Sequence, residues 1–317
     1  MKTAIGGYFE LELRQGEHYH KNALRLNTAR NCLEYILRAK KYQKIYIPYY
    51  TCGVILEPIE KCDIAYEFYH IDINLEPECE FVLKNSEAFL YTNYFGLKQN
   101  TIEKLAELYG NQLIIDNSQA FYAEPIKGID TFYSARKFFG VPDGAYLYTN
   151  KLLDQDLRQD ISYERVSHLL KRIDISAEAG YVDFQQNDKS FENQPIKKMS
   201  KLTDKILQSI NYSNAKQQRI NNYKLLDKHL KNSNQIRFDF AENAIPMIYP
   251  YFSDDKNLRN KLIQNKIFVA KYWHNVLEWC KQDSIEHELT GKLLPLPIDQ
   301  RYNSSDINTI IGVINES

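Results

Sequence analysis

A lysine and an aspartate carry the chemistry that this sequence predicts. Asp116 ends the short apolar run of residues 113–115, and Lys137 follows Ser134 by three positions. A carboxylate at the end of a buried strand, followed by a lysine at the start of a loop with a hydroxyl nearby, can hold pyridoxal phosphate (PLP). Taken alone, Lys137 is an ordinary solvated surface residue, as most lysines are. The residues around it decide between the two interpretations.

PLP requires an amine, a carboxylate and an anion site from its protein. Lys137 can supply the amine that forms an imine with the PLP aldehyde, because lysine suits this chemistry. Asp116 can keep the pyridine nitrogen protonated from the carboxyl end of a strand, where ligands bind in open α/β sheets. The alternative role for Asp116 is to cap the loop that follows its strand.

The phosphate of PLP is best held by backbone N–H groups at a helix N-terminus and by hydroxyls. Thr28, Ala29 and Arg30 begin a predicted helix and can supply such a site. The alternative is an ordinary helix cap. Ser134 offers a second hydroxyl, and Gln119, three residues past Asp116, can lie near the ring or its hydroxyl.

Strands and helices alternate through the first half of the chain. The predicted strands are residues 44–48, 64–71, 87–92, 113–116, 131–133 and 144–148, and the predicted helices are residues 29–37, 53–60 and 102–109. Strands that alternate with helices indicate an α/β layer fold with a mostly parallel sheet.

The second half of the chain has a different pattern. Residues 152–193 are polar and poorly periodic, which permits helices joined by a loop, and residues 183–194 have loop composition. A long helical pattern over residues 202–230 breaks near residues 211–214. The predicted elements that follow are strands at 245–252, 267–270 and 293–298 and helices at 255–264 and 305–314. We therefore expect a large domain over residues 1–200 and a small α+β domain over residues 201–317 that begins with a long inter-domain helix.

The composition argues against several classes of function. The chain has 317 residues, 44% of them hydrophobic, which is enough for a sizeable core. A net charge of -1 gives no basis for binding nucleic acid or an anionic membrane. The five cysteines lack CxxC spacing, which argues against a zinc site. Without a signal peptide or a long apolar run, we expect a cytoplasmic protein.

The ordered motifs resemble those of the DegT/DnrJ/EryC1/StrS sugar aminotransferases, which are fold-type I PLP enzymes. Residues 114–122 and 130–150, around Asp116 and Lys137, carry most of the resemblance. The other matching segments, in the same order as in the family, are residues 26–37, 45–59, 68–74, 90–96 and 293–311. The resemblance implies a three-layer αβα large domain with a mostly parallel sheet and a small α+β C-terminal domain.

The resemblance also implies roles for single residues. Lys137 matches the Schiff-base lysine, Asp116 the aspartate at the pyridine nitrogen, and Gln119 the residue near the ring. The positions that match the phosphate site are Thr28, Ala29, Arg30 and Ser134. Members of the family act as homodimers whose active sites are built from both chains, so we expect the same here.

The sequence departs from the family pattern at the substrate end. The aromatic residue that often stacks on the PLP ring is replaced by Cys52, with Tyr50 close by, and both are candidates for contact with the ring. The usual Gly-Glu-Gly-Gly run is absent from residues 141–145. The motif that supplies groups to the neighbouring subunit keeps only its Met-Ser pair, within residues 194–200. The substrate therefore need not be a standard nucleotide sugar.

These observations predict a PLP-dependent aminotransferase. Its amino donor would be glutamate or glutamine, and its acceptor a keto-sugar, nucleotide-linked in the family, used in surface polysaccharide or secondary-metabolite sugar synthesis. One alternative is a PLP-dependent sugar dehydratase, although family members with that activity replace the lysine with histidine. The other is a non-catalytic relative that binds or regulates, which Cys52 permits and the intact pair of Lys137 and Asp116 argues against.

Overall fold

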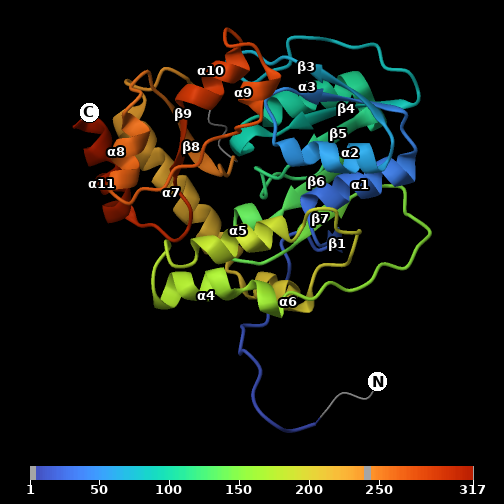
Figure 1. Cartoon of the computed structure of the whole chain (residues 1–317), viewed down its shortest axis with the longest axis horizontal. Helices are drawn as coiled ribbons and strands as arrows, with labels where there is room; N and C mark the ends of the chain where they lie inside the picture. Colours follow the sequence, from blue (N-terminus) through green and yellow to red (C-terminus); the bar gives the residue numbers. More distant parts are fainter. Residues whose placement is uncertain (1–4, 239–243, 317) are drawn as a thin grey trace.

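The computed structural model describes residues 5–238 and 244–316. Figure 1 shows a sheet covered by helices on one side of the molecule, with the C-terminal part of the chain packed beside it. No helix in the described ranges is both long enough and apolar enough to cross a membrane.

Most of the described strands form one large sheet. In the described part of the chain it has seven strands, in the order β1-β7-β6-β5-β4-β2-β3. The bounds are β1 (Leu24–Leu26), β2 (Lys44–Pro48), β3 (Ala65–Tyr69), β4 (Glu87–Thr92), β5 (Leu113–Asp116), β6 (Asp130–Ser134) and β7 (Ala145–Tyr148). Neighbours from β3 to β6 run parallel, whereas β7 and β1 are antiparallel to their partners. The predicted α/β class with a mostly parallel sheet is confirmed.

Helices cover both faces of this sheet and give three layers. On one face α1 (Ala29–Lys40) and α2 (Leu56–Lys61) bury Leu33, Ile36 and Ile59 against the strands. On the other face α3 (Gln99–Tyr109) packs in the same hydrophobic cluster as the C-terminal part of the chain. Because parallel strands end at one edge, the loops after β5 and β6 meet there.

The C-terminal part is built on helices and a small sheet. The long helical pattern is interrupted as predicted, between α6 (Lys201–Ser209) and α7 (Tyr212–Leu230). The other described elements are β8 (Ile248–Phe252), α8 (Leu258–Gln264), α9 (Val276–Trp279), α10 (Ile285–Lys292), β9 (Leu293–Pro297) and α11 (Ser304–Asn315). β8 and β9 pair antiparallel. The domain boundary at residue 200 stays a prediction, since one hydrophobic cluster runs from the large sheet into this part.

Two local predictions are wrong. The expected strand at residues 267–270 does not form, because Arg259 donates to the carbonyls of Val269 and Ala270 and takes the acceptors that a strand partner would use. The loop expected at residues 183–194 is helical over much of its length in α5 (Tyr181–Lys189). Together with α4 (Ser167–Asp174), α5 lies below the large sheet in Figure 1.

Candidate active site

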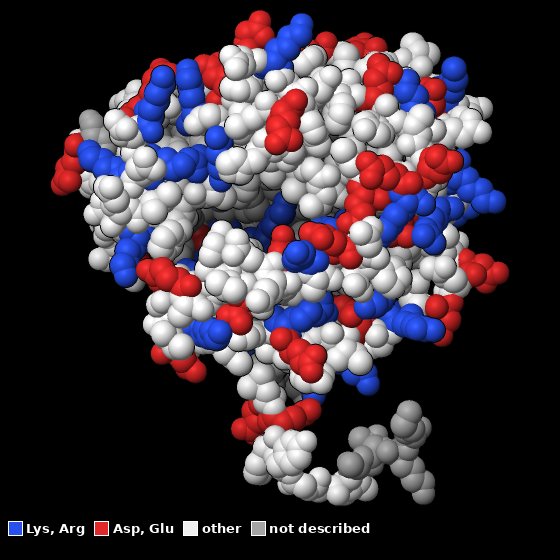
Figure 2. Space-filling model, in the orientation of Figure 1, with Lys and Arg blue, Asp and Glu red and all other residues white. Residues whose placement is uncertain are grey.

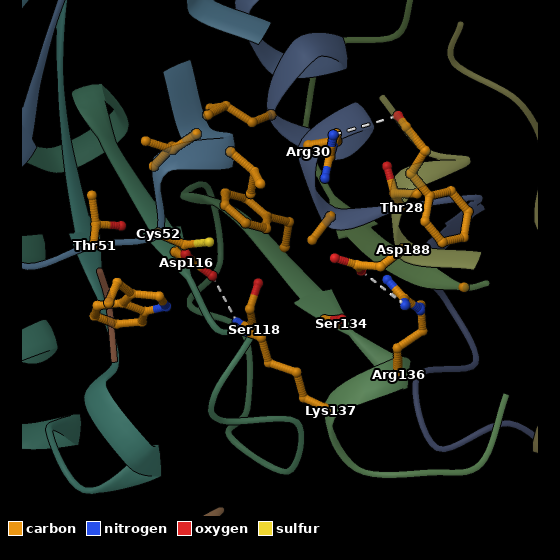
Figure 3. A pocket seen from close by; sticks show the side chains of 18 of the residues that line it. Thr28, Arg30, Thr51, Cys52, Asp116, Ser118, Ser134, Arg136, Lys137 and Asp188 are labelled. Carbon is orange, nitrogen blue, oxygen red and sulfur yellow. Dashed lines mark hydrogen bonds and ion pairs between the residues drawn. The ribbon is translucent and has the colours of Figure 1, made fainter. Parts of the chain in front are cut away.

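A cavity of about 270 Å³ lies at the carboxyl ends of β5 and β6. Figure 2 shows this face hollowed near its centre, with basic groups at the bottom of the hollow. The cavity joins residues far apart in sequence, and Figure 3 shows their side chains. The predicted site residues that line it are Thr28, Ala29, Arg30, Cys52, Asp116, Ser134 and Lys137.

Tyr50 and Gln119 lie behind the wall of the cavity. Gln119 is fully buried, and its side-chain oxygen accepts a hydrogen bond from the Phe95 backbone N–H at 3.0 Å. Tyr50 is also fully buried, and its ring meets Trp273 edge-on at 5.0 Å between centroids. Tyr50 and Gln119 therefore support the cavity wall from behind and do not line the cavity.

Asp116 sits at the end of β5, between Thr92 of β4 and Phe132 of β6. Its side chain accepts a hydrogen bond from the Ser118 backbone N–H at 2.7 Å. Burial raises the pKa of the Asp116 carboxyl, and the Lys137 ammonium and the Ser118 hydrogen bond only partly oppose this shift. The ionised carboxylate is thus incompletely compensated, so a cation placed beside it in the cavity would be stabilised.

Lys137 ends the tight turn η4 (Ala135–Lys137), which directly follows β6. The turn is fixed by a hydrogen bond from the Ala135 N–H to the Gly144 carbonyl and by the buried rings of Phe138 and Phe139. Lys137 itself is exposed, and its side chain points toward Ser118 and Asp116 (Figure 3). A hydrogen-bonded turn therefore presents the Lys137 amine beside the partly buried Asp116 carboxylate.

The N-terminus of α1 forms another wall of the cavity. Thr28 is the helix cap, and its hydroxyl oxygen accepts from the Asn31 N–H at 3.1 Å. The N–H groups of Ala29 and Arg30 open the helix, where backbone donors have no intrahelical partner. With the Ser134 hydroxyl at the end of β6, this wall can hold an anion.

The structure adds side chains that the sequence reasoning missed or placed elsewhere. Arg136 lines the cavity beside Lys137 and forms an ion pair with Asp188 at 3.1 Å. Its guanidinium lies over the Phe191 ring at 4.6 Å. Trp273 completes the wall near Cys52. Arg136 is the sequence neighbour of Lys137, whereas Asp188, Phe191 and Trp273 come from distant parts of the chain.

The departures from the family motifs have a structural role. Asp143 is fully buried and accepts from the Ser200 N–H at 2.8 Å, from the Ser200 hydroxyl at 2.6 Å and from the Thr203 hydroxyl. It therefore fixes the start of α6. Gly144 has a φ of +112°, and a Cβ there would come within 2.8 Å of Thr203. Residues 141–145, which replace the family's glycine-rich run, therefore pack closely against Met199 and Ser200.

The three layers and the seven-stranded sheet of this chain form a fold that is found in solved PLP-dependent enzymes. Solved structures share it, among them a DegT DnrJ EryC1 StrS aminotransferase from Brucella abortus (TM-score 0.64, 15% identity, 93% of this chain and 85% of that chain). Others are a putative sugar aminotransferase from Streptococcus pneumoniae in its PMP-form (0.64, 12%, 93% and 87%) and E. coli GDP-4-keto-6-deoxy-D-mannose-3-dehydratase with bound hydrated PLP (0.64, 14%, 92% and 87%). The predicted fold is confirmed. No protein-family model and no curated protein sequence matches the chain.

Proposed function

We propose that this chain is a PLP-dependent aminotransferase of the DegT/DnrJ/EryC1/StrS type, which moves an amino group from glutamate or glutamine to a keto-sugar. The observation that carries the proposal is that Lys137 and the Asp116 carboxylate line one cavity at the strand ends, with the carboxylate only partly compensated. Structures of the same fold that carry PMP or hydrated PLP support the choice of cofactor.

The residues of the cavity fit PLP. Asp116, whose ionised carboxylate is undercompensated, would face the pyridine nitrogen. The open N–H groups at the start of α1 and the Ser134 hydroxyl would hold the phosphate. When bound, PLP supplies an electron sink for the substrate carbon next to the amine.

Lys137 would act as the general base and acid of the reaction. With PLP bound, the Lys137 amine would take the proton from the substrate carbon that bears the nitrogen, and would give a proton back to complete the amino transfer. The turn η4 holds this amine at the cavity wall, and Asp116 keeps a positive charge beside it favourable. The identity of the keto-sugar depends on the Cys52 and Trp273 side, where the family pattern is lost.

Lys137 and Asp116 also argue against the two alternative functions. A sugar dehydratase has this fold, but the family resemblance associates that activity with histidine, whereas this chain has Lys137. A binding or regulatory protein would have no need for an amine beside a carboxylate whose burial costs free energy. Amino transfer therefore remains the better proposal.

We also propose a homodimer in the cytoplasm. Large apolar side chains that lie more than half exposed gather on α4, α5 and the turn between them: Leu170, Ile173, Ile175, Tyr181 and Val182. α5 and the residues after it also supply Asp188 and Phe191 to the cavity, so a second copy seated here would lie next to the site. Free thiols at all five cysteines agree with a reducing compartment.

The cofactor proposal is tested by adding PLP to the purified protein and following its absorbance. We expect a saturable spectral shift that L-glutamate converts to the amine form of the cofactor. The Lys137→Ala variant would lose both. A Lys137→Ala protein with the full wild-type spectral shift and glutamate response would refute the proposal.

The dimer is tested separately by light scattering during gel filtration. The wild-type chain is expected at twice its monomer mass, and Ile173→Glu is expected to shift it toward the monomer because a charge would be buried in the interface. A monomeric wild-type protein would refute the dimer and leave the cofactor proposal intact.

A further inference from the structure

Two arginine side chains face one end of the cavity from different elements. Arg30 belongs to the first turn of α1, and Arg136 lies in the turn η4. Their side chains are 10% and 19% exposed, so both guanidinium groups are largely withdrawn from water. Figure 3 shows them on the same side of the cavity as Thr28 and Ser134.

Two guanidinium groups and the positive end of the α1 dipole meet at this end of the cavity. Burial lowers the pKa of the Arg136 guanidinium, the Asp188 carboxylate opposes the shift, and the Arg30 guanidinium adds to it. Arg30 pairs with Glu57 at 2.6 Å, but Glu57 is shared with Lys61 at 2.8 Å. The N-terminus of α1 adds further partial positive charge. A bound anion would be stabilised by the helix terminus and by any guanidinium group that turns toward it.

The two acidic partners differ in how firmly they are held. Glu57 lies in α2 with a side chain 17% exposed and two cationic partners. Asp188 lies in the last turn of α5 with a side chain 55% exposed, paired with Arg136 at 3.1 Å. Because Asp188 can turn to solvent at little cost, another anion can replace it on Arg136.

We propose that Arg136, together with Arg30, binds the phosphate of the cofactor, and that this phosphate displaces Asp188 from Arg136. The inference rests on the proposed function, since PLP brings the phosphate. In the family, a motif at the position of residues 194–200 supplies groups to the neighbouring subunit's site, and this chain lacks most of it. Arg136 would supply an anion contact from the same chain. An arginine fork suits phosphate because it donates two parallel hydrogen bonds.

The test compares PLP with pyridoxal, which lacks the phosphate, by absorbance titration of the full-length protein. Arg136→Met is expected to weaken PLP binding roughly ten- to hundredfold, the loss typical of a charged hydrogen-bonding group. Asp188→Asn is expected to tighten it about two- to fivefold by removing a competing anion. Pyridoxal affinity should change less than about twofold in both variants, because pyridoxal does not use this end of the cavity.

Arg165 provides a matched control. It stacks on the same Phe191 ring at 5.0 Å and pairs with Asp160, but it does not line the cavity. Arg165→Met should therefore leave PLP affinity unchanged. If Arg136→Met does not fold, the Asp188→Asn variant decides the question, because the Asp188 side chain is half exposed. Tighter PLP binding in this variant supports the inference, and weaker binding rejects it.

Several results would overturn the inference: equal effects of Arg136→Met on PLP and pyridoxal, weaker PLP binding in Asp188→Asn, or an Arg165→Met loss as large as that of Arg136→Met. If wild-type protein binds neither PLP nor pyridoxal, the proposed function fails. The arginine site is then tested by inorganic phosphate, which should raise the melting temperature of wild type more than that of Arg136→Met. Equal shifts would reject it.

Discussion

The two sides of the cavity are built in different ways. The cofactor end consists of Thr28, Ala29, Asp116, Ser134 and Lys137, which lie at the start of α1 or directly at the ends of β5 and β6. The closing side is formed at two places: Tyr272 and Trp273, from the loop before α9, lie near Cys52, whereas Asp188 and Phe191, from α5 and the residues after it, lie beside Arg136.

This difference separates what the fold fixes from what the chain can vary. The cofactor end depends on parallel strands and a helix terminus, and a sheet holds such positions rigidly. The closing side depends on segments that pack onto the sheet from elsewhere. Changes at the cofactor end should therefore abolish chemistry, whereas changes at the closing side should alter affinity or specificity.

The largest effect is expected at Lys137. Lys137→Ala should slow the half-reaction with L-glutamate by about a thousandfold or more, since it removes both the attachment point and the proton carrier. Its melting temperature without cofactor should fall only slightly, because the side chain is exposed and its loss removes only the partial compensation of the Asp116 carboxylate. Stopped-flow absorbance and thermal melts measure the two properties. A loss of rate below about tenfold would contradict the claim that residues at the cofactor end carry the chemistry.

Asp116→Asn should slow the same half-reaction by about a hundredfold and also stabilise the cofactor-free protein. Folding raises the pKa of this carboxyl, so its ionised form costs stability at neutral pH, and that cost disappears as the pH falls and the carboxyl protonates. The gain in melting temperature over wild type should therefore be larger at about pH 7 than at about pH 4.5. An equal gain at both values, or a loss at neutral pH, would contradict this account.

Asp143→Ala tests the hydrogen bonds that hold the start of α6 against the loop after Lys137. It leaves the Ser200 and Thr203 donors without their buried acceptor, so the free energy of unfolding should fall by about 2 kcal/mol. Denaturant unfolding measures the loss. Asp156→Ala, at an almost fully exposed side chain, is the control and should leave stability unchanged. Similar stability of the two variants would show that this network does not hold α6.

The smallest effect is expected at Trp273. Trp273→Ala should raise the L-glutamate concentration that gives half-maximal rate by about fivefold, while PLP affinity changes less than twofold. Titrations with each ligand measure both values. The opposite outcome, with PLP affinity reduced and the glutamate requirement unchanged, would assign Trp273 to the ring face and move it to the cofactor end.

The cofactor end could be predicted from the sequence because its residues are set by local pattern. Asp116 ends an apolar strand, Lys137 follows the next strand, and Thr28 precedes an amphipathic helix. Such signals need only a few neighbouring residues. The same pattern predicted most of the large sheet.

The closing side could not be predicted in this way. α4 buries none of its residues and α5 buries only Asn187, while Ile173 and Val182 are exposed to solvent, so these helices lack the pattern of a segment that packs on a core. Asp188 reaches Arg136 from more than fifty positions away, a contact that only the tertiary structure provides. Tyr50 and Gln119 lie beside the wall, because sequence proximity to a site does not fix which way a side chain points.

The central claim is that Lys137 bonds covalently to PLP beside Asp116. The direct test is borohydride reduction of the protein mixed with PLP, followed by digestion and mass spectrometry of the peptides. The account predicts one predominant modified lysine, Lys137, with modification of Lys137→Ala reduced to the low level of surface lysines. Modification spread evenly over surface lysines, or the same yield in Lys137→Ala, would contradict it.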